Sequence, residues 1–72
     1  MNKKNKIKII VNGKQMTVKL KFSIKNLIDK LKMPITKIAI ELNREIINKK
    51  NINKFYLKNG DKVEIVHFIG GG

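Results

Sequence analysis

The chain has 72 residues, no cysteine, a single histidine and a formal net charge of +12. A domain of this size buries only about 60% of the surface that its unfolded chain exposes, so its core is thin and leaves no space for a deep active-site pocket. The composition also excludes a disulfide and a thiol-bound acyl or sulfur group, and it nearly excludes a zinc site built on His and Cys ligands.

The N-terminal third predicts a loose charged end followed by a hairpin. Residues 1–5 are polar and lysine-rich with no long apolar run behind them, which argues against a signal peptide or transmembrane helix and favours a cytoplasmic protein without a membrane partner. Residues 7–11 alternate between two faces, as a half-buried strand does. Asn12-Gly13 is typical of a type I′ turn and predicts a return strand over residues 16–21.

The period then changes to that of a helix. Ser23 is a suitable N-cap, because its hydroxyl can accept a hydrogen bond from the first turn, and Phe22 and Leu27 have the spacing of a hydrophobic staple. Apolar residues at i, i+3, i+4 and i+7 form one helix face. Pro34 forbids continuation, so the spacing predicts a helix over residues 24–32.

The second half of the chain predicts three more strands. Residues 38–43 alternate and form a third strand, and residues 46–47 form a short fourth strand. The polar segment 48–58 contains scattered apolar residues and is expected to include one helical turn. Residues 59–61 form a turn before a last strand over residues 63–69.

This ββαβ(β)β order indicates an α+β domain of the β-grasp, or ubiquitin-like, type over residues 1–69. We expect a mixed sheet of four to five strands, with one main helix packed on one face and the last strand in a central position. Residues 70–72 are expected to form a flexible glycine tail. The predicted core consists of Ile7, Ile9, Val18, Leu27, Ile28, Leu31, Ile40, Leu42, Val63 and Ile65.

Gly70, Gly71 and Gly72 follow an apolar strand without a polar spacer. Glycine has no Cβ, so such a tail can pass through a narrow channel and adopt angles that are closed to other residues. We expect the tail to reach into a partner's active site, where the α-carboxylate of Gly72 reacts. A carboxylate is a poor acyl donor, and its usual activation is by ATP as an acyl-adenylate. This chain has no Gly-rich phosphate loop, so we expect ATP and Mg²⁺ to bind to the partner and no cofactor to bind here.

Two segments, IAIELNREII at residues 38–47 and NGDKVEIVHFIGGG at residues 59–72, resemble the thiamine-biosynthesis sulfur carriers of the ThiS family. Members often carry AVELNxEIV followed by GDxVEIVxxxGGG. The resemblance covers nearly the whole chain after its first residues. One departure is Asn48-Lys49-Lys50, where many members have proline and arginine.

The resemblance implies a carrier rather than an enzyme, with no catalytic residue of its own. A ThiF-type adenylyltransferase would adenylate Gly72, and a sulfur donor protein would supply sulfur for a C-terminal thiocarboxylate. Thiazole synthase would then accept that sulfur to build the thiazole ring of thiamine.

Strand alternation separates two faces of the last strand. If Val63 and Ile65 pack under the helix, Val66 and Phe68 point outward and are candidate docking contacts beside the tail. His67 shares the face of Val63 and Ile65, and a lone strand histidine is more often structural than catalytic.

Three alternatives share parts of this pattern. A molybdopterin synthase small subunit uses the same terminal carboxylate, but such chains are typically longer and end in a plain double glycine. A ubiquitin-like modifier would form an isopeptide bond with lysine. A basic nucleic-acid-binding module would explain the charge, but Arg44 is the single arginine and the aromatic residues follow no RNA-binding motif. We therefore interpret the lysines as a solvated surface open to acidic partners and expect no specific nucleic acid partner.

Overall fold

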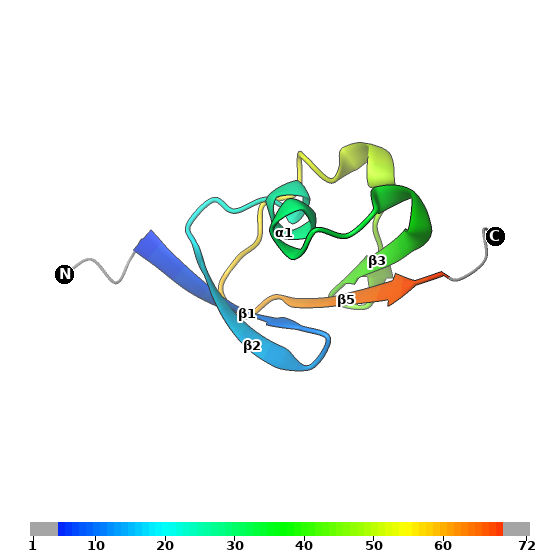
Figure 1. Cartoon of the computed structure of the whole chain (residues 1–72). Coiled ribbons are helices and arrows are strands. Elements are labelled where there is room, and N and C mark those ends of the chain that lie inside the picture. The colour runs from blue at the N-terminus through cyan, green and yellow to red at the C-terminus, as the bar shows by residue number, and fades with distance from the viewer. Residues whose placement is uncertain (1–4, 69–72) are drawn as a thin grey trace.

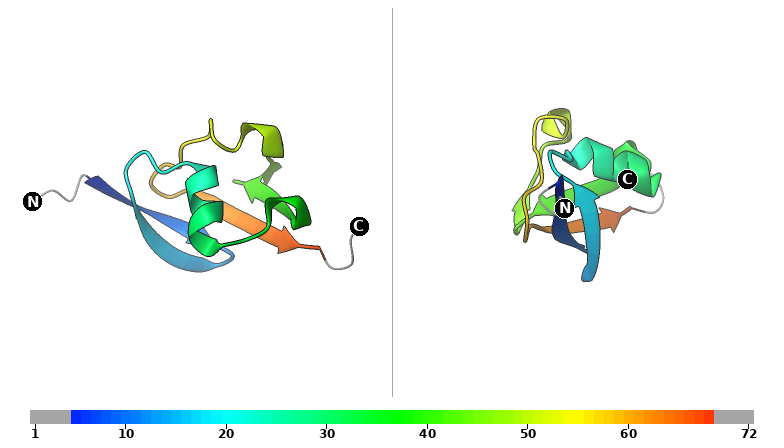
Figure 2. Two further views of the ribbon diagram at one scale, coloured as in Figure 1. Left: turned by 45° about the horizontal axis from the view of Figure 1, so that its top comes forward. Right: turned by 90° about the vertical axis from the view of Figure 1, so that its left-hand side faces the viewer.

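The computed structural model describes residues 5–68, which form one mixed sheet with a helix on one face (Figures 1 and 2). The strands follow the order β2-β1-β5-β3-β4 across the sheet. β5 is therefore central, parallel to β1 and antiparallel to β3. This is the β-grasp arrangement that the sequence predicts. In chain order the elements are β1 Lys6–Val11, β2 Lys14–Lys19, α1 Ile24–Leu31, η2 Ile35–Lys37, β3 Ile38–Leu42, β4 Glu45–Ile46, η3 Lys49–Asn51 and β5 Lys62–His67.

The predicted hairpin forms at Asn12-Gly13. Both residues have positive φ angles, 49° and 83°, which a type I′ turn requires. The turn pairs Val11 directly with Lys14, so β2 begins two residues earlier than expected. Because β1 ends here, its parallel pairing with β5 also ends at Val11↔Val63.

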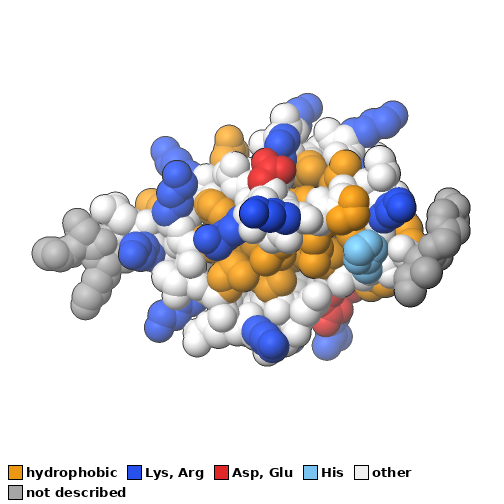
Figure 3. All heavy atoms as spheres, in the orientation of Figure 1, with side chains coloured by type: hydrophobic (Ala, Val, Ile, Leu, Met, Phe, Trp, Pro, Cys, Tyr) orange, Lys and Arg blue, Asp and Glu red, His pale blue; other side chains and the backbone are white. Residues whose placement is uncertain are grey.

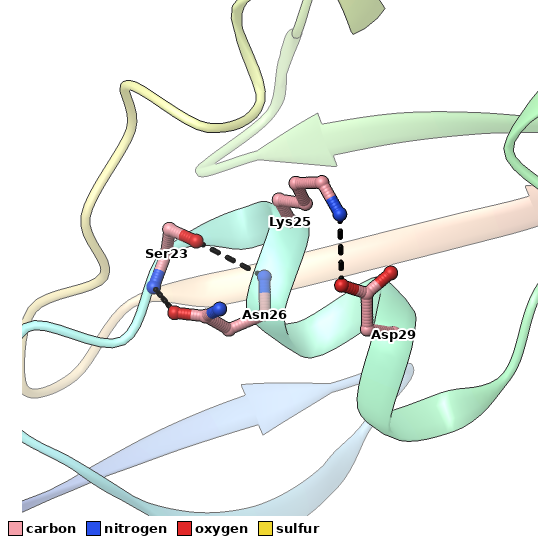
Figure 4. Close-up of polar contacts among 4 residues, drawn as sticks. All are labelled: Ser23, Lys25, Asn26 and Asp29. Carbon is pink, nitrogen blue, oxygen red and sulfur yellow. Dashed lines mark hydrogen bonds and ion pairs between the residues drawn. The ribbon is translucent and has the colours of Figure 1, made fainter.

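Helix α1 is fixed at both ends by local hydrogen bonds. The Ser23 hydroxyl accepts from the backbone N–H of Asn26, and the Asn26 side chain accepts from the Ser23 N–H in return (Figure 4). This reciprocal capping box satisfies two donors that would otherwise have no partner. Lys25 and Asp29 form an exposed i,i+4 ion pair on the same helix. Lys32 has the left-handed φ of 56° and ends the helix one residue before the predicted boundary.

The core lies between the helix and the sheet, and eight of the ten predicted core residues are buried. Leu31 and Leu42 are the two corrections, because both are only half-buried at the ends of α1 and β3. Other buried apolar side chains lie outside the predicted set: Val11, Ile24, Ile38, Ile47, Ile52 and Leu57.

The connections after the helix differ in detail from the sequence prediction. The 3-10 turn η2 was not predicted, and β4 is Glu45–Ile46, one residue earlier than predicted. Ile47 is buried, and its N–H donates to Ile40 O. The expected helical turn in segment 48–58 is η3. β5 spans Lys62–His67, and the predicted last strand residue, Ile69, lies outside the described residues. No helix within residues 5–68 is long and apolar enough to cross a membrane.

Candidate functional site

The predicted carrier residue Gly72 and the tail residues Gly70 and Gly71 lie outside the described residues. The structure describes the segment that leads to them. β5 is the central strand, and it runs toward the end of the sheet opposite to the one where β1 begins (Figure 1). The described part of the candidate site is therefore the end of β5 together with the residues that hold it.

The end of β5 is held differently on its two sides. On the β3 side, His67 pairs with Ile38, and the Phe68 N–H donates to Lys37 O at 2.8 Å. On the β1 side, the Asn12 side chain replaces the missing strand: Oδ1 accepts from the Ile65 N–H at 2.7 Å, and Nδ2 donates to Ile65 O at 3.3 Å. These contacts hold β5 on both sides as far as Ile65 and on one side as far as Phe68.

Val66 and Phe68 are exposed, with 56% and 42% of their surface accessible, whereas Val63 and Ile65 are buried. The predicted contrast holds for these four residues, whereas His67, assigned to the face of Val63 and Ile65, is exposed. Whether Val66 and Phe68 dock a partner stays a prediction. Ile46, which is 77% exposed, adds a third large apolar side chain on the same half of the sheet.

Two carboxylates lie beside these apolar residues. Glu41 of β3 pairs directly with Glu64 of β5 and also with Ile46 of β4. Like charges opposite each other on adjacent strands destabilise a sheet slightly. The alternation in β5 places Glu64 on the face of Val66. Sequence analysis missed Ile46 and this carboxylate pair, because the register of β3 with β4 and β5 is not visible in the local pattern.

Lys49 is a further residue that sequence analysis did not place. Its ammonium donates to Ile35 O at 3.1 Å and to Ile38 O at 2.8 Å. The same nitrogen lies 5.8 Å from the centre of the Phe68 ring, within the range of a cation–π contact. The only earlier signal was that the segment 48–50 departs from the family pattern.

The described residues do not assemble a metal-binding cluster around this end of the sheet. His67 is exposed, and no cluster of three or more potential metal ligands occurs within residues 5–68. An open groove of about 410 Å³ lies between the hairpin and the end of α1, with a mainly apolar lining that includes Val11, Met16 and Leu31. Figure 3 shows hydrophobic side chains gathered in the middle of one face, with side chains of the Lys and Arg class among and around them.

Comparison with known proteins agrees with this fold. The sequence model of the ThiS family matches residues 9–72. The chain belongs to the ThiS family. The family match thus includes both the central strand and the glycine residues that follow it.

Solved and curated relatives give the same family. The crystal structure of the thiamine biosynthesis protein ThiS from Geobacter metallireducens superposes with a TM-score of 0.79 at 32% identity, and the match covers 92% of this chain and 100% of that chain. The sulfur carrier protein ThiS of Bacillus subtilis is 46% identical over 35 residues, which are 49% of this chain and 53% of that protein.

A third relative is much longer than this ThiS-family chain. A protein named thiazole synthase from Paramagnetospirillum magneticum is 35% identical over 66 residues, or 92% of this chain. The chain spans only 20% of the length of that relative. A domain similar to this one therefore forms one part of a protein with that name.

Proposed function

We propose that this ThiS-family chain is a sulfur carrier in the biosynthesis of the thiamine thiazole, and not an enzyme. The observation that carries the proposal is the family match through residue 72, where three glycines follow the central strand of a β-grasp domain. The carrier group is the carboxylate of Gly72. Gly70 and Gly71 are the part of the tail that enters partner active sites, where their small size is useful.

The proposed chemistry takes place in two partner-assisted steps. In the active site of a ThiF-type adenylyltransferase, an oxygen of the Gly72 carboxylate attacks the α-phosphate of ATP, and pyrophosphate leaves. Hydrosulfide released from a donor protein then attacks the acyl carbon, and AMP leaves. The product is a thiocarboxylate on Gly72. ATP and Mg²⁺ belong to the partner, and the requirement for ATP fits a cytoplasmic location.

Thiazole synthase is the proposed acceptor of the sulfur. The long relative of that name supports this choice, because a domain similar to this chain is joined there to the remainder of a thiazole synthase. A fused domain is held at a high effective concentration beside its partner. We propose that this separate chain instead reaches thiazole synthase by docking on its surface.

The exposed apolar residues beside the tail are the proposed docking contacts. Val66 and Phe68 lie at the end of the strand that leads to Gly72, so a partner that covers them is also placed to receive the tail. Exposed apolar patches with polar rims are typical of interaction surfaces. The neighbouring pair Glu41 and Glu64 supplies a polar rim that a basic partner surface would complement.

Intact mass spectrometry tests the proposal after incubation with a ThiF-type enzyme, ATP, Mg²⁺ and a sulfide source. The mass is expected to rise by the difference between a sulfur and an oxygen atom, with the change located at Gly72. A chain extended by two residues after Gly72 should not react, because an internal carbonyl has no carboxylate oxygen to attack ATP. The same two residues added before Met1 are the matched control and should leave the reaction intact.

The variant Gly71→Ala tests the role of the tail. Its Cβ restricts the backbone angles and widens the tail, so sulfur loading should fall while the melting temperature stays unchanged. A modification found on a lysine or on His67, or full reaction of the extended chain, would contradict the proposal. A product with the summed mass of this chain and another protein, less one water, would instead indicate a ubiquitin-like modifier.

A further inference from the structure

Lys49 lies where three segments of the molecule meet. It belongs to η3, its ammonium donates to Ile35 O and Ile38 O, and it lies over the Phe68 ring at 5.8 Å. Ile35 opens η2, and Ile38 begins β3 directly after it. One side chain therefore joins both ends of the η2 turn to the last described residue after β5.

The main chain of Phe68 is bound to the same turn. Its N–H donates to the carbonyl of Lys37, at 2.8 Å, and Lys37 is the last residue of η2. Phe68 is thus held twice, by its backbone to the last residue of η2 and by its ring to the lysine whose ammonium bonds to both ends of η2. A displacement of the lysine would loosen the turn and remove the ring contact together.

The environment of Lys49 differs from that of the other lysines. Among the lysines in residues 5–68, it is the one that is half-buried, whereas the others are exposed. No ion pair joins it to a carboxylate within the described part of the chain. Its partners are instead two backbone carbonyls and an aromatic ring. Such contacts stabilise an ammonium that is partly removed from water, whereas water itself solvates the ammonium of an exposed lysine.

We infer that Lys49 is a positioning residue, which fixes Phe68 and so sets the direction in which the chain leaves the sheet toward Gly72. The effect on the tail rests on the proposed carrier function, whereas the contacts of Lys49 with Phe68 and η2 do not depend on it. When the residue that leads toward the tail is already fixed, less conformational freedom is lost as the tail enters a partner's active site. The lysine therefore favours productive docking without contacting the reacting carboxylate.

Amide hydrogen exchange in the free protein, followed residue by residue by NMR, tests the geometry. In Lys49→Met the Phe68 amide should exchange about fivefold faster or more, the size expected from the loss of a cation–π contact and charged hydrogen bonds. The Asn12 amide, which donates to Val63 O on the other side of β5, should keep its protection. Lys49→Arg should restore protection at Phe68, because it keeps the charge and the donors.

Lys50→Met is the matched control, since it removes the same charge from the adjacent exposed residue. It should leave the exchange of both amides unchanged. The inference is overturned if Lys49→Met and Lys50→Met have the same effect on the exchange of the Phe68 amide. It is also overturned if Lys49→Met speeds the exchange of the Asn12 and Phe68 amides equally, which would indicate a general loss of stability. Phe68→Leu tests the ring contact separately, because it removes the ring while leaving both carbonyl contacts of Lys49 in place.

Activation kinetics with a ThiF-type enzyme test the consequence. Lys49→Met should lower kcat/KM for adenylation about fivefold, with Lys49→Arg and Lys50→Met within about twofold of the wild type. Equal kcat/KM for all variants would overturn the role of Lys49 in tail positioning. If the wild type itself is not adenylated, the proposed function fails, while the exchange measurement still decides whether Lys49 fixes Phe68.

Discussion

Asn12 has two separate structural roles. Its backbone takes a φ of 49° in the turn between β1 and β2, and its side-chain amide makes two hydrogen bonds with the backbone of Ile65. Asparagine suits both roles, because it tolerates left-handed angles better than most residues and its amide can imitate a peptide group. The side chain in effect extends β1 by one pairing position along β5.

We predict that Asn12→Ala lowers the free energy of unfolding by about 1–3 kcal/mol, because Ile65 loses both partners and alanine is strained at a positive φ. Asn12→Gly separates the two effects, since glycine accepts the angle without strain but cannot bond to Ile65. Urea unfolding of the three proteins provides the measurement. An Asn12→Gly variant as stable as the wild type would show that the side-chain bridge contributes nothing.

At the scale of single residues, the sequence predicted the turn at Asn12-Gly13 but not the hydrogen bonds between the Asn12 side chain and Ile65. The turn could be predicted because the two adjacent residues Asn12-Gly13 are sufficient to indicate it. The partner of the Asn12 side chain is 53 residues away, and it becomes visible only when β5 lies beside β1. The contacts of Lys49 were missed for the same reason, since its three partners come from two other segments of the chain.

Among the elements, helix α1 was predicted most completely, because its cap, its apolar face and its end are all encoded within a dozen residues. Segment 48–58 was predicted least well. Its buried residues Ile52 and Leu57 do not follow a period, because backbone contacts to the start of α1 fix them. Phe55 O accepts from Ile24 N–H, and Leu57 N–H donates to Phe22 O.

Leu27 lies on the buried face of α1 and is fully buried. Leu27→Ala should therefore destabilise the domain by about 2–5 kcal/mol, through lost apolar contact and the cavity that remains. Leu20→Ala is the matched control: this leucine is 47% exposed, so the same substitution should cost less than about 1 kcal/mol. Thermal unfolding followed by circular dichroism compares the two. Equal losses would contradict the assignment of the core.

Strand β5 carries the proposed docking surface, which can be tested apart from stability. Val66→Glu places a charge on an exposed position, so the melting temperature should stay within a few degrees while partner binding weakens about tenfold or more. Leu20→Glu introduces the same charge at an exposed leucine after β2, and it should leave binding unchanged. Titration calorimetry against the activating enzyme measures both. Loss of folding in Val66→Glu would contradict the exposed position of Val66. Equal affinity of the two variants would show that the docking surface lies elsewhere.

For the whole molecule, the net charge of +12 is distributed rather than focused. Exposed lysines occur in β1, β2, α1, β5 and the loops that connect them. Figure 3 shows Lys and Arg side chains spread over one face, at its centre and its margins, instead of in a single stripe. Composition predicted the amount of charge, but its arrangement depends on the fold, which also places Glu41 and Glu64 opposite each other.

This arrangement predicts weak and unselective binding to nucleic acid. Phosphate contacts release counterions, so a basic protein without base-specific contacts binds DNA in a strongly salt-dependent way, typically with a Kd of 10⁻⁴ to 10⁻⁶ M at physiological salt. Fluorescence anisotropy with two labelled duplexes of different sequence, measured at about 0.05 and 0.15 M salt, tests this. Both duplexes should bind alike and weaken steeply together, because exposed charges are screened over about 10 Å at 0.1 M salt. Tight binding to one duplex that persists at the higher salt would assign the lysine surface a specific nucleic acid partner, and it would contradict our interpretation of that charge as a solvated surface.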